Sequence, residues 1–140
     1  MLSAGESAWI NDSYWLVMPY KLKDTGVTIR YEGVGETLNG RAADIVSLRF
    51  SGVGRTPANK YHVYVSRASG LIEQWDFYST ADDPEPALRT PWSNWQRYGR
   101  IMLSSDRGEL RGRAAKITDI RVRDVVPPGV FTSPDPVVWK

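Results

Sequence analysis

An antiparallel β-hairpin is predicted for residues 27–50, which read VTIRYEGVGETLNGRAADIVSLRF. Apolar and polar residues alternate along 27–31, and this period of two is typical of a half-buried strand. Asn39-Gly40 favours a two-residue type I′ turn, because both central residues of that turn need a positive φ. The second strand of the hairpin is therefore expected at 42–50.

Two further strands are predicted at 61–66 and 71–78, since both segments are rich in β-branched and aromatic residues. Ser69-Gly70 favours a turn between them. Residues 79–91 carry three prolines and three acids and are predicted to form an exposed loop.

A last hairpin is expected between 100–105 and about 111–123, with its turn at 106–108. The tail that follows is rich in proline, which argues against regular structure there. We therefore expect a mainly β fold, an antiparallel meander of about six strands with at most one or two short helices.

The segment 8–18 admits two interpretations. Ile10, Tyr14 and Val17 have the spacing of a short helix that ends at Pro19, yet 14–17 would also suit a strand. The expected organisation is one domain over 1–140. It has an N-terminal segment at 1–26, the sheet at 27–123 and the proline-rich tail at 124–140.

Composition excludes several classes of protein. The chain has 140 residues, 41% of them hydrophobic, which is too apolar for a disordered protein. A net charge of +2 without a basic run predicts no nucleic-acid partner. No apolar run is long enough to span a bilayer, and the first residues do not have the pattern of a signal peptide. The absence of cysteine excludes disulfides and thiolate chemistry.

Several predicted strands are apolar on both faces. Trp75 and Phe77 point to one side and Ile72 and Tyr78 to the other, and 45–50 repeats the pattern. A sheet with one solvated face alternates more cleanly. This pattern indicates that both faces are covered, either by more protein or by a bound apolar molecule.

Five segments carry a resemblance to a known family. They are NDSYWLVMPYKLKDTGVTIRYEG (11–33), GVGRTPANKYHVYV (52–65), SGLIEQWDFY (69–78), PWSNWQRYGRIMLSSDR (91–107) and VPPGVFTSP (126–134). In order and spacing they resemble the C-terminal part of uncharacterised bacterial envelope proteins that are related to the LolA-like outer-membrane lipoprotein-sorting proteins.

The resemblance implies an open half-barrel whose concave side is closed by helices and holds acyl chains. It implies a non-catalytic protein of the periplasm or cell envelope that binds an apolar ligand such as an acyl chain or a lipidated protein. A missing N-terminal portion of the family pattern would leave a sheet edge unpaired. The alternative is therefore a structural or interaction module that pairs through its sheet with another chain or its own copy.

Large apolar side chains are the candidates for lining the ligand pocket. They are Tyr14, Trp15, Leu48, Phe50, Tyr64, Trp75, Phe77, Trp92, Trp95 and Tyr98. The aromatic residues between 92 and 98 either fill one end of the core or form the lip of the pocket. Arg97, Arg100 and Arg107 are expected to be surface charges, with pairing to a lipid phosphate or carboxylate as the alternative.

No catalytic residue, metal ligand or cofactor is predicted. His62 is the only histidine and is expected to have a structural or surface role. A catalytic triad with Ser66 or Ser104 lacks the sequence of a nucleophile elbow. Asp82 and the acids beside it could bind Ca²⁺, but their spacing favours a solvated loop. The Gly-Val-Gly repeats at 33–35 and 52–54 are interpreted as bends and not as phosphate-binding loops.

Overall fold

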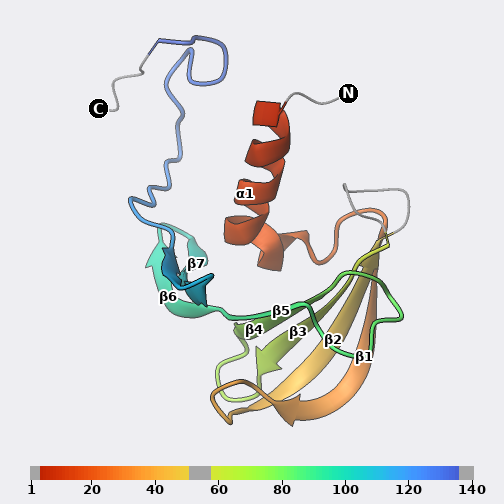
Figure 1. The fold of residues 1–140 in the computed structure, drawn as a ribbon. Coiled ribbons are helices and arrows are strands. Elements are labelled where there is room, and N and C mark those ends of the chain that lie inside the picture. The colour runs from red at the N-terminus through yellow and green to blue at the C-terminus, as the bar shows by residue number, and fades with distance from the viewer. Residues whose placement is uncertain (1–3, 51–57, 136–140) are drawn as a thin grey trace.

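The computed structural model describes residues 4–50 and 58–135, which form one helix and eight strands (Figure 1). In chain order they are α1 (Ala4–Lys21), β1 (Val27–Glu36), β2 (Ala42–Phe50), β3 (Lys60–Ser66), β4 (Ile72–Tyr78), β5 (Leu88–Pro91), β6 (Ser93–Tyr98), β7 (Ile101–Leu110) and β8 (Arg113–Lys116).

The strands form two antiparallel sheets. The larger has the order β1-β2-β3-β4-β5 and the smaller β6-β7-β8, so neighbours in the sequence are neighbours in each sheet. The predicted mainly β, antiparallel class is confirmed. The expected single sheet is wrong, because the chain changes sheets at Trp92, between β5 and β6. Neither sheet closes into a barrel.

The predicted hairpin at 27–50 is confirmed, with a different turn. Thr37 N donates to the carbonyl of Arg41 at 2.9 Å, which leaves a three-residue loop. Within that loop only Gly40 has a positive φ, so Asn39-Gly40 does not form a type I′ pair. The arrangement matches a type I turn followed by a left-handed glycine. The expected irregularity in the first strand is confirmed as a bulge between Tyr31 and Gly33.

The predicted last hairpin is misplaced. β7 continues through 106–108, where the pairing with β8 shifts and Gly108 has a φ of 72°. The turn lies at Arg111-Gly112, whose φ angles of 52° and 75° are the positive pair that a type I′ turn needs. β8 is accordingly only four residues long, and residues 117–123 have no regular structure.

The predicted loop at 79–91 is too long, because its last four residues form β5 at the edge of the larger sheet. Pro91 is the last residue of β5 and Pro84 and Pro86 precede it. An edge strand tolerates proline since one side of its backbone has no neighbour to bond.

The helical interpretation of 8–18 is confirmed, but the helix does not end at Pro19. Proline has no amide hydrogen, so the carbonyl of Trp15 lacks its usual donor four residues on. Arg107 Nη2 on β7 donates to this carbonyl instead. The expectation that Arg107 is a surface charge is therefore wrong: the residue is 2% exposed, and its guanidinium lies 3.5 Å from the centre of the Trp92 ring.

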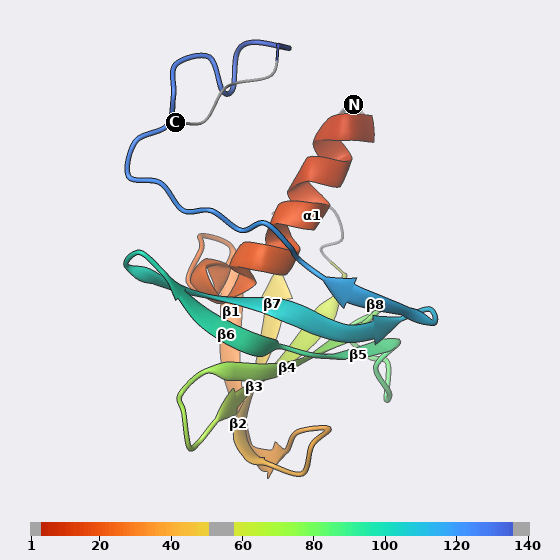
Figure 2. The ribbon, with the colours of Figure 1, turned by 90° about the vertical axis from the view of Figure 1, so that its left-hand side faces the viewer.

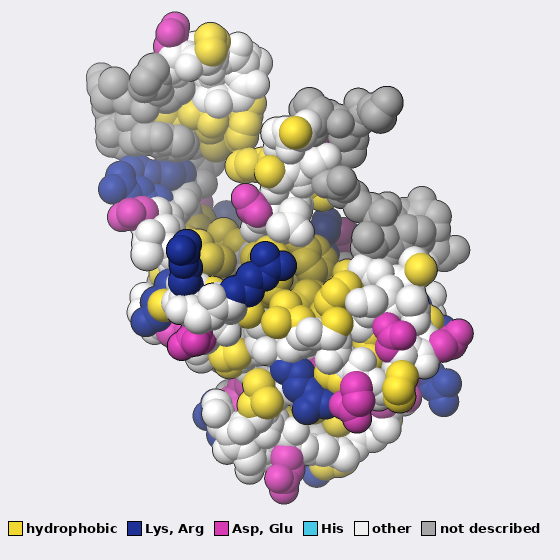
Figure 3. All heavy atoms as spheres, in the orientation of Figure 1, with side chains coloured by type: hydrophobic (Ala, Val, Ile, Leu, Met, Phe, Trp, Pro, Cys, Tyr) yellow, Lys and Arg dark blue, Asp and Glu magenta, His cyan; other side chains and the backbone are white. Residues whose placement is uncertain are grey.

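The core lies between α1 and one face of the larger sheet, with Trp92 joining it to the smaller sheet. Its buried members are Met18, Leu48, Val63, Ile72, Trp75 and Trp92. α1 stands on the sheets with its N-terminal end pointing away from them, and the C-terminal segment leaves β8 on the same side (Figures 1 and 2). In Figure 3 hydrophobic side chains gather in the middle of one face, below α1, so a single helix leaves part of the apolar surface uncovered.

The prediction that β4 is apolar on both faces is wrong for Ile72, whereas Tyr78 lies on the second face and is 6% exposed. The pairing with β3 skips Glu73, so Ile72 lies opposite Val65 and joins Trp75 in the core. The opposite face of the sheet carries mainly polar side chains, described below. Among the described residues, no helix has the length and apolarity to cross a membrane.

Candidate functional site

Most of the predicted ligand-binding side chains pack around one aromatic cluster. Tyr61 stacks on Trp75 with ring centres 5.0 Å apart, and Trp15 meets Trp75 edge-on at 4.9 Å. Phe50 and Phe77 contact Tyr61 from either side. These rings fill the space between α1 and β2–β4, which accounts for their apolarity as core packing.

The remaining predicted residues are divided between three places. Trp92 and Trp95 pack against the core, and Trp95 Nε1 donates to the carbonyl of Ile72 at 2.8 Å. Tyr98 is half-buried at the end of β6. Tyr64 lies on the opposite face of the larger sheet, bonded to Asp76, so it does not share a pocket with the others.

An apolar groove lies elsewhere, between α1, β7 and the segment that follows β8. It holds about 350 Å³ and is called the α1–β7 groove below. Its walls are formed by Leu16, Val17, Tyr20, Ile101, Leu103, Ile120, Arg121 and Val122. Figure 2 shows the C-terminal segment running from β8 past the lower part of α1, where it forms the third wall.

Tyr20 holds α1 at the open edge of β7. Its hydroxyl donates to the carbonyl of Met102 at 2.8 Å and accepts from the Met102 amide at 3.1 Å. β8 is too short to pair with this part of β7, so Tyr20 satisfies backbone groups that a longer neighbouring strand would have used. The side chains of Ile101 and Leu103 remain available to the groove.

The polar contacts of the third wall include a hydrogen bond and an ion pair. Ile117 N donates to the carbonyl of Ser105 at 2.9 Å, and Arg100 lies 3.9 Å from Asp124. Both side chains of this ion pair are more than 90% exposed. Such pairs contribute little to stability, so this ion pair adds little to the hold on the wall.

A second hollow of about 430 Å³ adjoins the groove. It is lined by Asp119, Arg121, Arg123 and Val126. Arg121 lines both hollows. The combined site is thus apolar on the side of α1 and charged on the side of the tail.

None of the predicted ligand-binding residues lines this groove. Sequence analysis missed it because its walls come from residues about 80 to 100 positions apart. The signals that were present are the helical spacing of Leu16 and Tyr20 and the alternation of Ile101 and Leu103. Neither pattern indicates that the two elements meet.

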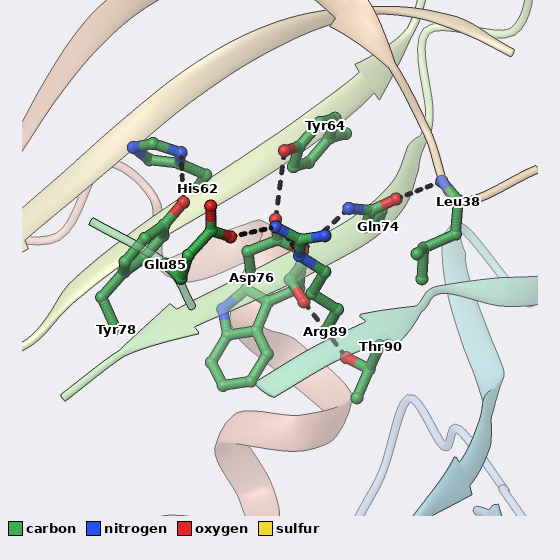
Figure 4. A network of polar contacts seen from close by, with 10 residues as sticks. Leu38, His62, Tyr64, Gln74, Asp76, Tyr78, Glu85, Arg89 and Thr90 are labelled. Atoms are coloured by element: carbon green, nitrogen blue, oxygen red, sulfur yellow. Dashed lines mark hydrogen bonds and ion pairs between the residues drawn. The ribbon is translucent and has the colours of Figure 1, made fainter. Parts of the chain in front are cut away.

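A network of polar side chains covers the other face of the larger sheet (Figure 4). The Asp76 carboxylate is 1% exposed and accepts from Gln74 Nε2 at 2.8 Å and from the Tyr64 hydroxyl at 3.0 Å. Arg89 Nε lies 3.7 Å from the same carboxylate. Gln74 Oε1 accepts from the amide of Leu38, which ties the β1–β2 turn to the middle of the sheet.

Burial shifts the pKa values of this network in opposite directions. It raises the pKa of Asp76 above its ordinary value, although the hydrogen bonds from Gln74 and Tyr64 and the charge of Arg89 act the other way. Burial lowers the pKa of His62, with Lys60 adding to the effect. His62 Nδ1 lies 3.1 Å from the Tyr78 hydroxyl, in agreement with the predicted structural role.

Ser47, His62 and Asp76 lie in register on adjacent strands but are hydrogen-bonded to other groups. Ser47 Oγ donates to Glu32, His62 bonds with Tyr78, and Asp76 accepts from its own neighbours. The serines considered from sequence are likewise engaged: Ser104 Oγ donates to the carbonyl of Ser93. No chain of bonds from serine to histidine to carboxylate forms within the described residues, and such a chain is what a triad requires.

Two of the acids at 82–85 bond to residues close to them in the chain. Asp83 accepts from the amide and the hydroxyl of Thr80, and Glu85 pairs with Arg89 at 2.8 Å. Over residues 4–50 and 58–135, no group of three His, Asp or Glu side chains is placed to hold a metal ion. The Gly-Val-Gly repeat at 52–54 lies outside the described residues.

No protein-family model, curated protein or solved structure matches the chain. The resemblance to the LolA-like proteins therefore stays a prediction from sequence motifs.

Proposed function

We propose that the protein is a non-catalytic binding module that takes one apolar chain, such as an acyl chain, in the α1–β7 groove. The lining of the groove supports this proposal, because seven of its eight residues offer apolar or aromatic surface. Its volume of about 350 Å³ lies at the small end of ligand pockets, about 300–1,000 Å³, and suits a single chain.

A ligand would enter past the third wall, a largely exposed segment without regular structure. A ligand that lies between this segment and α1 gains a covered apolar surface. Each buried CH₂ group contributes about 0.8 kcal/mol, so binding needs no elaborate polar contacts.

The resemblance extends the proposal to shape and location. We propose that the larger sheet with α1 on one face serves as the open half-barrel of LolA-like proteins, acting in the periplasm or cell envelope. In that setting the bound acyl chain would be part of a lipid or of a lipidated protein. The arrangement of one helix on one face of a meander sheet supports this part of the proposal.

A chain-length series tests the function. Affinities for octanol, decanol and dodecanol, measured by displacement of a neutral fluorescent probe, should rise by about fourfold per CH₂ group until the groove is filled. The variant Val122→Asp should weaken dodecanol binding at least tenfold, because an unpaired carboxylate would face the chain.

Val125→Asp is the matched control, since Val125 is 80% exposed on the same segment and lies outside the groove. It should bind dodecanol as the unchanged protein does. Absence of saturable binding, or equal effects of the two substitutions, would contradict the proposal.

A second candidate function rests on the free edge of β1. Ile29, Tyr31 and Val34 are 43%, 58% and 57% exposed on this edge strand. We propose that it pairs antiparallel with β1 of a second copy, with Tyr31 opposite its own counterpart. Arg30 then lies opposite Glu32 of the second copy, so the charges of the paired strands are complementary.

Sedimentation velocity over a range of concentrations tests this pairing. The protein should form dimers that Ile29→Lys dissociates and that Val126→Lys, on the tail, leaves intact. A protein that stays monomeric at every concentration would exclude the second candidate and leave the first untouched.

A further inference from the structure

Arg121 is the charged residue at the boundary between the α1–β7 groove and the second hollow. Among the described residues no carboxylate forms an ion pair with it, so its guanidinium can pair with a ligand. A guanidinium beside an apolar wall is suited to an anion, because it offers several donors in one plane.

Arg121 offers one positive charge to a negative group in the second hollow. The carboxylate of Asp119 lies in the same lining. A doubly charged phosphate would exceed that charge and would meet Asp119 as well. A monoanion is matched, with its charge next to Arg121 and its apolar part toward α1.

We infer that the ligand is a single-chain amphiphile with a monoanionic carboxylate head, of the chemical class of a fatty acid. Its chain lies in the α1–β7 groove and its carboxylate in the second hollow against Arg121. This inference rests on the proposed function and adds to it the identity of the head group. The groove of about 350 Å³ would hold the apolar chain, and the hollow of about 430 Å³ would hold the carboxylate head.

Three ligands with the same chain length test the head group: dodecanoate, dodecanol and dodecyltrimethylammonium, all below their micelle-forming concentrations. Dodecanoate should bind at least tenfold more tightly than dodecanol, and the cation should bind most weakly. Raising the salt concentration should weaken dodecanoate binding and leave dodecanol binding unchanged.

Arg121→Gln should lower the affinity for dodecanoate to that for dodecanol without changing the latter. Arg113→Gln is the control, because Arg113 is exposed on β8 and lines neither hollow. Equal binding of dodecanoate and dodecanol by the unchanged protein would overturn the head-group inference alone. Failure of all three ligands to bind would overturn the proposed function with it.

Discussion

Arg107 and Pro19 show how a residue that interrupts a helix can be compensated from another element. Burial lowers the pKa of the Arg107 guanidinium to about 10, which leaves it charged at neutral pH. The guanidinium donates hydrogen bonds to the carbonyls of Trp15, Ser104 and Asp106 and to the Ser104 hydroxyl. The carbonyl that Pro19 leaves without a donor is thereby satisfied, which allows α1 to continue to Lys21.

A double-mutant cycle measures this coupling. Arg107→Lys should lower the free energy of unfolding by about 2 kcal/mol, because a lysine cannot reach the same carbonyls or stack on Trp92. In a Pro19→Ala background the loss should be smaller, since the alanine amide supplies the missing donor to the Trp15 carbonyl. Urea denaturation of the four proteins gives the coupling, and strictly additive losses would rule it out.

The pH dependence of stability should carry a contribution from Asp76. Its folded pKa is raised above 3.8, so the folded state holds the proton more tightly than the unfolded state. Stability from this residue is therefore lost as the pH rises from about 3.8 through the raised folded pKa, and restored on acidification.

Asp76→Asn should remove that contribution, which is seen by comparing the free energies of unfolding of both proteins across this pH range. His62→Gln is the control of opposite sign. The pKa of His62 is lowered, so its burial weakens the fold as the pH falls through 6.5. An unchanged pH profile in Asp76→Asn would show that the buried carboxylate does not contribute.

At the scale of elements, the two sheets meet closely where β5 faces the bulge in β7. A Cβ atom at Gly108 would lie 2.9 Å from Cγ of Pro91, and Gly108 has a positive φ. Glycine is required there for two reasons, the left-handed backbone and the close approach of the neighbouring strand.

Comparison of two glycines separates these reasons. Gly70→Ala should lower the free energy of unfolding by about 1 kcal/mol, because Gly70 has a similar φ of 70° and open space around it. Gly108→Ala should lower it by about 2–3 kcal/mol, since the contact with Pro91 adds to the backbone strain. Thermal or urea denaturation measures the free energy of unfolding of both variants. Equal losses would show that Pro91 can shift to accommodate the new methyl group at no cost.

Sequence patterns predicted the elements well where neighbouring residues carry the signal. The hairpin at 27–50 and the strands at 61–66 and 71–78 depend on alternation and on turn residues, both of which are local. The boundaries of β7 and the face on which Ile72 of β4 lies were predicted wrongly. Both depend on bulges, and a bulge is fixed by the partner strand as much as by its own residues.

At the scale of the whole molecule, the apolar packing of α1 within the described residues differs along its length. Tyr14, Trp15 and Met18 pack in the core, whereas Trp9 and Ile10 near the other end are 67% and 42% exposed. Within the described residues, the exposed apolar side chains at this end add little packing to stabilise the helix, and short isolated helices are marginal in water.

Hydrogen exchange should show this difference. Amides of α1 before Tyr14 should exchange roughly tenfold faster than those from Trp15 to Lys21. Addition of an alcohol that fills the groove should slow exchange in the second part and leave the first unchanged. Uniform protection along α1 would indicate that another contact supports its N-terminal half.

The period of hydrophobic residues was enough to establish a mainly antiparallel β fold and most of its strands, because a strand shows its buried face in every second side chain. The groove, the buried Arg107 and the division into two sheets required the folded chain. Tyr20 and Met102 are 82 residues apart, and Trp15 and Arg107 are 92 apart. Such contacts form when whole elements pack together. The local sequence around each residue therefore does not predict its distant partner.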